Sequence, residues 1–174
     1  MDIFLEILKF TLPTLIALII VYLIINRFLN GENSRRNYEV RKSIVNLVTP
    51  IKLSAYERLV LFLERTSPES LILRIQRPGM TNLELQAALL SAIRQEYEHN
   101  FSQQLYVSHQ ASVMVKNARE SLVQLINTLS ANLTPTDDST LLATAVIKVY
   151  YSVEEPPATV AINFLKAEVR SYFG

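Results

Sequence analysis

The sequence contains no cysteine, no tryptophan and only 3 glycines among its 174 residues. Without cysteine the chain forms neither disulfides nor thiolate metal sites. So few glycines argue against a β fold rich in tight turns, and they leave no glycine-rich loop to cradle the phosphates of a nucleotide. A cysteine-free chain suits either side of a membrane, so this absence does not fix the compartment.

A surplus of charge of one sign is also missing. The chain has 17 Lys and Arg residues against 16 Asp and Glu residues, a formal net charge of +1. Proteins that bind nucleic acid normally carry a clear basic surplus. The sequence therefore predicts no nucleic-acid partner.

Catalytic motifs are absent as well. The sequence has no Gly-x-Ser-x-Gly and no His-Glu-x-x-His string. Ser108 and His109 are adjacent, but a hydrolase also needs a third orienting group and an oxyanion hole. We therefore expect no catalytic residue and no cofactor, and a protein that is not an enzyme is favoured.

The strongest positive signal is an apolar run near the start of the chain. The 17 residues of segment 10–26 carry no charge, and weakly polar flanks extend the run to about 3–29. A helix needs about 20 apolar residues to cross a hydrocarbon core about 30 Å thick. Residues 1–30 are therefore predicted to be a single transmembrane helix.

A cleaved signal peptide and a buried core helix are the alternatives to this anchor. The chain starts with acidic Asp2 and Glu6 where a signal peptide has a basic region, and no small-x-small cleavage site follows Ile25. A retained anchor is the preferred interpretation.

The charges that flank the run predict its orientation. Only Lys9 is positive before it, whereas five basic residues follow it. The excess of Lys and Arg marks the cytoplasmic side, so we expect the N-terminus outside and residues 30–174 in the cytoplasm. Anionic lipid head groups could bind the same cluster, although the topology alone explains it. The membrane-proximal basic residues are Arg27, Arg35, Arg36, Arg41 and Lys42.

Helix start signals recur through the rest of the chain. Three strings place a capping residue before a proline at the first helical position, namely Thr49-Pro50, Ser67-Pro68 and Thr134-Pro135. Residues 81–84 form a capping box. We therefore expect a juxtamembrane helix at 31–49 and a helical bundle at 50–174. Its helices are predicted near 50–66, 68–76, 81–106, 109–132, 136–154 and 157–173.

The two longest of these helices carry the clearest periodicity. Apolar residues recur at three- and four-residue steps, which predicts that each helix buries one face. The short turn around Ser108 favours an antiparallel hairpin. A strand at 143–151 is the chief alternative to an all-α fold, and helix is preferred because one strand would have no partner. The two predicted stripes are Leu83, Ala87, Leu90, Ile93, Tyr97 and Phe101, and then Ala111, Met114, Ala118, Leu122, Leu125 and Leu129.

A dense polar strip follows on the end of the first long helix. Such residues can satisfy the end of one helix and the start of the next, or they can form a docking face for a partner. The candidate interaction strip is Glu96, Glu98, His99, Asn100, Gln103, Gln104 and Ser108.

Glu96 and His99 also form a Glu-x-x-His pair. Di-iron bundles use two such pairs and two further glutamates. This sequence has no second pair, so no complete metal site is expected from one chain. A symmetric dimer would have to supply the second pair, with Glu64 or Glu120 as an added ligand.

The chain resembles an uncharacterised family of small membrane-anchored proteins of Bacteroidota-type bacteria. The likeness covers nearly the whole chain. It implies a bacterial cytoplasmic membrane but no activity and no site residue. The strings that carry it are Tyr56-Glu57-Arg58-Leu59, Leu61-Phe62-Leu63-Glu64-Arg65, Ile93-Arg94-Gln95-Glu96-Tyr97-Glu98-His99-Asn100 and Ser102-Gln103-Gln104-Leu105-Tyr106-Val107-Ser108.

These observations predict a membrane-tethered, non-enzymatic helical module that binds a protein partner or itself. Two other interpretations remain open. One is a metal-binding helical enzyme that uses Glu96 and His99, and the other is an accessory subunit of a larger membrane complex.

Overall fold

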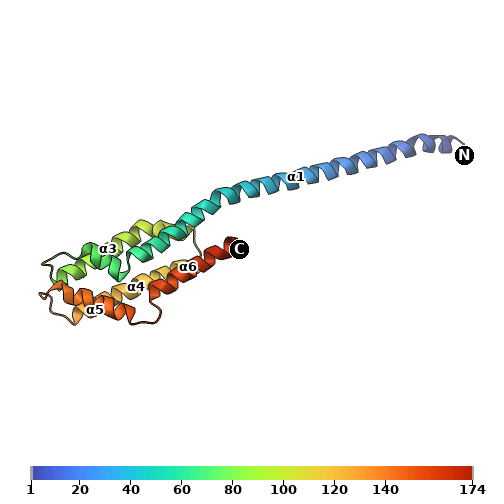
Figure 1. Cartoon of the computed structure of the whole chain (residues 1–174). Coiled ribbons are helices and arrows are strands. Elements are labelled where there is room, and N and C mark those ends of the chain that lie inside the picture. Colours follow the sequence, from blue (N-terminus) through green and yellow to red (C-terminus); the bar gives the residue numbers. More distant parts are fainter. Residues whose placement is uncertain (1, 174) are drawn as a thin grey trace. The chain divides into compact units, whose positions relative to one another are not determined.

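The computed structural model describes residues 2–173, and it describes their side chains except at 2–12, 14, 28–35, 37 and 173. Within these residues the fold is all-α, as predicted, and consists of seven helices without a strand (Figure 1). The segment 143–151 is helical, which excludes the alternative of a strand there. The elements are α1 (Asp2–Arg65), α2 (Pro68–Ile75), α3 (Asn82–Asn100), the 3-10 helix η1 (Phe101–Leu105), α4 (His109–Ala131), α5 (Ser139–Tyr151) and α6 (Pro157–Phe173).

The chain divides into two compact units, Met1–Thr49 and Pro50–Gly174. Helix α1 contributes residues to both. The predicted helix start at Thr49-Pro50 is wrong, because both residues are helical within α1. Proline removes one backbone donor from a helix, but Pro50 is exposed, so water can satisfy the carbonyl that loses its partner.

No helix in the described part of the chain combines the length and the hydropathy that a membrane span requires. The predicted anchor at 1–30 falls in large part on side chains outside the described set, namely those at 1–12, 14 and 28–30. The anchor side chains that are described, at position 13 and at 15–27, are exposed in the isolated chain.

The second unit has two clusters of buried apolar side chains. The first joins α2, α3, α4 and α5, and the second joins the end of α1 to α4 and α6. Helix α4 supplies buried residues to both. The first cluster consists of Leu71, Ile72, Leu85, Leu89, Ile93, Leu122, Ile126, Leu142, Ala143, Val146 and Tyr150. The second consists of Tyr56, Leu59, Phe62, Leu63, Ala111, Val115, Ala118, Ala161 and Leu165.

The buried face of α3 is rotated from the predicted stripe. Leu85, Leu89 and Ile93 are buried, whereas Leu83 and Ala87 are exposed. The predicted stripe is confirmed at Ile93, but it is wrong at Leu83, at Ala87 and at Phe101, which is also exposed. The reason is that α3 packs against α2 and α5 as well as α4, so the face with the most neighbours decides which row is buried.

The predicted buried face of α4 agrees better with the structure than that of α3. Ala111, Ala118 and Leu122 are buried as expected. Val115 and Ile126 are buried in place of their neighbours Met114 and Leu125, which are half-buried. Helix α4 therefore turns nearly the predicted face toward the core.

Two of the predicted helix starts are confirmed. At α3 the Thr81 N–H donates to Glu84 Oε2 at 2.9 Å, and the Glu84 N–H donates to Thr81 Oγ1 at 3.3 Å, which is a complete capping box. Ser67 precedes α2, whose first residue is Pro68. The Ser67 hydroxyl, however, bonds Ser70 Oγ at 2.9 Å instead of a backbone N–H.

The predicted start at Thr134-Pro135 is wrong, because α5 begins at Ser139 and its cap is Asp138. The preceding residues form a turn that is tied to the start of α3 by the buried Asn82. Its Nδ2 donates to Thr134 O at 2.9 Å, and its Oδ1 accepts from Leu142 N at 3.3 Å. These tertiary bonds override the local signal for a helix.

Candidate functional site

Helices α3 and α4 lie side by side and antiparallel. Gln86 near the start of α3 donates to Asn127 Oδ1 at 2.9 Å and accepts from Ser130 Oγ at 2.8 Å, both near the end of α4. Toward the other end of the pair, the Arg119 guanidinium lies over the Tyr97 ring, 4.1 Å from its centroid. These contacts fix the register of the two helices.

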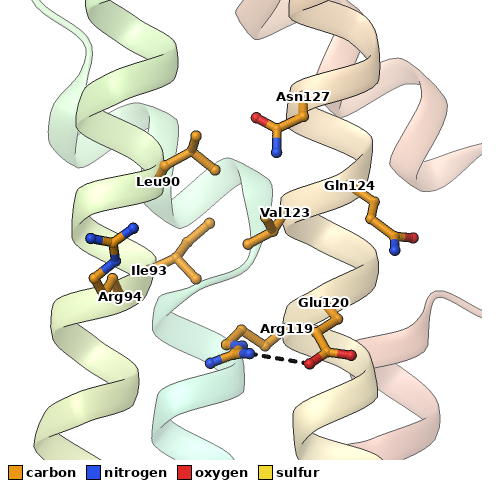
Figure 2. A pocket seen from close by; sticks show the side chains of 8 residues that line it. All are labelled: Leu90, Ile93, Arg94, Arg119, Glu120, Val123, Gln124 and Asn127. Carbon is orange, nitrogen blue, oxygen red and sulfur yellow. Dashed lines mark hydrogen bonds and ion pairs between the residues drawn. The ribbon is translucent and has the colours of Figure 1, made fainter.

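A groove of about 420 Å³ runs between these two helices, and we call it the α3–α4 groove. Figure 2 looks into it, with the other helices in view lying behind α3 and α4. The groove therefore faces away from the helices that cover the opposite side of the pair. It is lined by Leu90, Ile93 and Arg94 of α3 and by Arg119, Glu120, Val123, Gln124 and Asn127 of α4.

The floor of the groove is apolar and its rim is polar. Ile93 is buried, and Leu90 and Val123 are half-buried, so these side chains form the floor. Gln124 and Asn127 are exposed amides on the α4 side. This combination of apolar base and polar edge is the arrangement found at binding sites.

Cations outnumber carboxylates at the rim. Glu120 Oε1 lies 3.3 Å from Arg119 Nη2 and 3.9 Å from Lys116 Nζ, so two cations share one carboxylate. Arg94 is exposed and has no hydrogen bond or ion pair with any described residue. The groove therefore presents excess positive charge beside an apolar floor.

A second hollow of about 220 Å³ lies between the end of α3 and the start of α4. Tyr97 lines this hollow and Arg119 lines the α3–α4 groove, so their stacked pair stands between the two. Phe101 is 54% exposed here, and its ring packs edge-on against Tyr97 with centroids 5.9 Å apart. The residues that line the second hollow are Leu59, Tyr97, Asn100, Phe101, Gln104, His109, Ser112, Val113, Val115 and Lys116.

Three members of the predicted interaction strip make contacts within the bundle. Glu96 Oε1 accepts from Arg65 Nη2 at 2.7 Å and from Arg74 Nη1 at 3.3 Å. Asn100 is buried, and its Nδ2 donates to Glu96 O at 2.8 Å. Ser108 caps α4 by accepting from Ala111 N at 3.0 Å.

The remaining members of the strip do not share one surface. Glu98 and Gln104 are exposed, and Gln103 is half-buried with Nε2 3.4 Å from Ser102 Oγ. Gln104 lines the second hollow, as Asn100 does. His99 lies instead beside Glu96, Arg65 and Arg74 in a different hollow of about 430 Å³. Members of the predicted strip therefore line two different hollows, with Asn100 and Gln104 in one and Glu96 and His99 in the other.

The Glu96–His99 pair lacks a third metal-ligating side chain among the described residues. Among the side chains that the structure describes, no three His, Asp or Glu residues come together to hold a metal ion. Glu96 Oε1 is already held by two guanidinium groups, so ligation through this oxygen would require both ion pairs to break.

The membrane-proximal basic residues lie on α1. Arg27, Arg36, Arg41 and Lys42 are exposed. The side chain of Arg35 lies outside the described set.

One polar cluster was not anticipated from the sequence. Tyr56 is buried where α1 meets α6, its Oη accepts from Ser108 N at 3.4 Å, and burial is the main cause that raises its pKa. Glu168 and Tyr172 lie beside it and raise the pKa further. Glu168 Oε2 is buried without a hydrogen bond to any described residue. No motif in the sequence marks this cluster, because its members come from α1 and α6, which are far apart in the sequence.

The described residues form an all-α protein with a groove on the outer face of an antiparallel helix pair. The chain belongs to a family of unknown function (DUF7935), whose model matches residues 2–172. The match covers nearly the whole chain, as expected, and the family has no assigned function. No curated protein and no solved structure matches the chain.

Proposed function

We propose that this chain is a membrane-tethered, non-enzymatic helical module that binds another protein. The observation that carries the proposal is the α3–α4 groove, which combines an apolar floor with a polar, cationic rim. Protein interfaces likewise have an apolar centre and a polar rim, and arginine is enriched in them. The proposed docking face is the groove together with the second hollow beside it.

The contacts of the hairpin suit a preformed surface. Arg119 is held against Tyr97, and Gln86 joins α3 to α4 through two side-chain hydrogen bonds. Side chains that are already fixed lose little conformational entropy when a partner binds. A partner would therefore meet a face whose shape needs little adjustment.

The proposed tether is the uncharged segment 10–26 of α1. Between positions 15 and 25, every large apolar side chain is at least 48% exposed in the isolated chain. Soluble monomers rarely expose a continuous apolar patch of this extent, and lipid is one environment that would cover it. The basic residues after this segment favour a bundle in the cytoplasm and an N-terminus outside, in a bacterial cytoplasmic membrane.

Membrane extraction tests the tether. The full chain should stay in the membrane pellet after an alkaline carbonate wash and enter solution only with detergent. Replacing Leu18 and Leu23 by lysine should release it, because each charge near the centre of a helical span costs about 2.5–3.5 kcal/mol. Leu61→Lys, at an exposed position of the bundle, is the matched control and should stay in the pellet. Release of the unmodified chain by carbonate would refute the tether.

Purification from the native membrane tests the binding function. The tagged full chain should be recovered in a mild detergent with one other protein in a fixed ratio. Val123→Asp, which places a carboxylate on the apolar floor of the groove, should remove that protein from the complex. Leu141→Asp, at an exposed position of α5, should retain it. Recovery of the chain alone would contradict a protein partner.

A further inference from the structure

We infer that the α3–α4 groove binds an acidic amphipathic helix of a different protein. This inference rests on the proposed function and adds the class of partner. It depends on three features of the groove: two antiparallel ridges, an apolar floor and an excess of cations.

The shape of the groove suits a helix. Two antiparallel helices leave a long furrow between them, and a third helix can place its ridge of side chains in such a furrow. On α4 the lining residues run from Arg119 to Asn127. At a rise of about 1.5 Å per residue they span about 12 Å, which corresponds to roughly two helical turns.

The floor determines which side of the partner helix faces inward. Leu90, Ile93 and Val123 offer apolar side chains and no hydrogen-bonding group. A partner must therefore present apolar residues at three- and four-residue steps, as an amphipathic helix does. An extended segment would instead seek backbone hydrogen bonds, and the side chains of this floor provide none.

The rim determines the charge of the partner. Arg94 and Arg119 line the groove together with one carboxylate, that of Glu120, which also lies 3.9 Å from Lys116 Nζ. An arginine binds a carboxylate through a planar fork, and the Arg119 fork is held in place by the Tyr97 ring while its side chain stays 26% exposed. Asp or Glu residues beside the apolar ridge of the partner would balance the excess cations.

The same charges disfavour a second copy of this chain as the occupant. In such a complex, the exposed apolar segment of α1 near positions 40–48 of the second copy would lie in the groove. Arg41 and Lys42 lie within this segment and Arg36 precedes it, so the segment would bring further cations to a cationic rim. Like charges placed across an interface weaken binding. The expected occupant is therefore another protein.

Site-specific crosslinking in the native membrane tests the inference. A photoreactive phenylalanine analogue replaces Asn127 at the rim of the groove in one full-length variant and Leu141 on α5 in the control. Mass spectrometry then maps the crosslinked segment. The Asn127 variant should crosslink to a segment of another protein with apolar residues at three- and four-residue steps and with flanking Asp or Glu. The Leu141 variant should not.

Charge reversal tests the electrostatic part of the inference. Arg94→Glu in the Asn127 crosslinking variant should lower the yield of the adduct roughly tenfold, and reversal of a mapped acidic residue to lysine should restore it. Arg77→Glu makes the same change of charge at an exposed position outside the groove and should leave the yield unchanged.

The outcomes separate this inference from the proposed function. If a partner copurifies but Asn127 gives no adduct, or Arg94→Glu does not change the yield, the inference fails and the binding function stands. An adduct with a second copy, with lipid, or with a basic or extended segment also overturns the inference. If no partner is recovered at all, both fail.

Discussion

Replacing Asn82 by alanine should destabilise the bundle far more than its small change in volume suggests. Asn82 is 1% exposed, and its amide joins the start of α3 to the turn before α5 and to α5 itself. Alanine removes both side-chain hydrogen bonds, so Thr134 O loses a donor and Leu142 N loses an acceptor. A hydrogen bond contributes about 1 kcal/mol net, and a buried group left without a partner costs about 1–3 kcal/mol. The expected loss in the free energy of unfolding is therefore about 2–4 kcal/mol.

Urea unfolding of the full chain in a mild detergent, followed by circular dichroism, measures this loss. The midpoint should fall while the dependence on urea stays the same, because the surface exposed on unfolding does not change. Asn117→Ala, at an exposed position of α4, is the matched control and should be neutral or slightly stabilising, since alanine favours helix. A loss below about 0.5 kcal/mol for Asn82→Ala would refute the account of the turn, because surface substitutions produce effects of that size.

Three further predictions concern the core and the response to pH. Leu89→Ala, at a fully buried position of the first cluster, should lower the free energy of unfolding by about 2–5 kcal/mol in the same urea assay, and a loss like that of an exposed site would contradict the packing. Burial raises the pKa of Tyr56 in the folded state, so its stabilising effect is complete below the unfolded value of about 10 and is lost as pH rises further. Tyr56→Phe should flatten the fall in the urea midpoint between about pH 8 and about pH 11, and an unchanged fall would assign it to other groups. The Thr81 N–H lowers the pKa of Glu84, so the contribution of this cap is present above the unfolded pKa and is lost as pH falls through the folded one. Glu84→Gln keeps the acceptor without the charge and should make amide exchange at the start of α3 less sensitive to acid, whereas equal sensitivity would argue against this cap.

The sequence predicted the helices best where the signals are local. The capping box at Thr81 is set by residues three apart, and the structure has it as expected. The strings at Thr49-Pro50 and Thr134-Pro135 failed for different reasons. A helix can pass through an exposed proline, and a turn held by the buried Asn82 can delay a helix start.

The α3–α4 groove was harder to predict than the helices. The polar strip at 96–108 stands out in the sequence by its composition, yet three of its members make contacts within the bundle. Arg94 and Arg119 lie 25 residues apart in the sequence, and they line the same groove only because α3 and α4 bring them to one face. Which face stays uncovered depends on where α2 and α5 pack, and no local pattern contains that information.

Helix α4 supplies the buried residues Val115 and Ala118 to one apolar cluster and Leu122 and Ile126 to the other. About one helical turn separates the two sets, so a disturbance of α4 reaches both. We therefore expect the second unit to melt as one cooperative block, with matching amide exchange rates in α5 and α6. A partner bound along α4 would stabilise both apolar clusters at once. Its binding would slow amide exchange as far as the end of α6 without a change in the conformation of the chain.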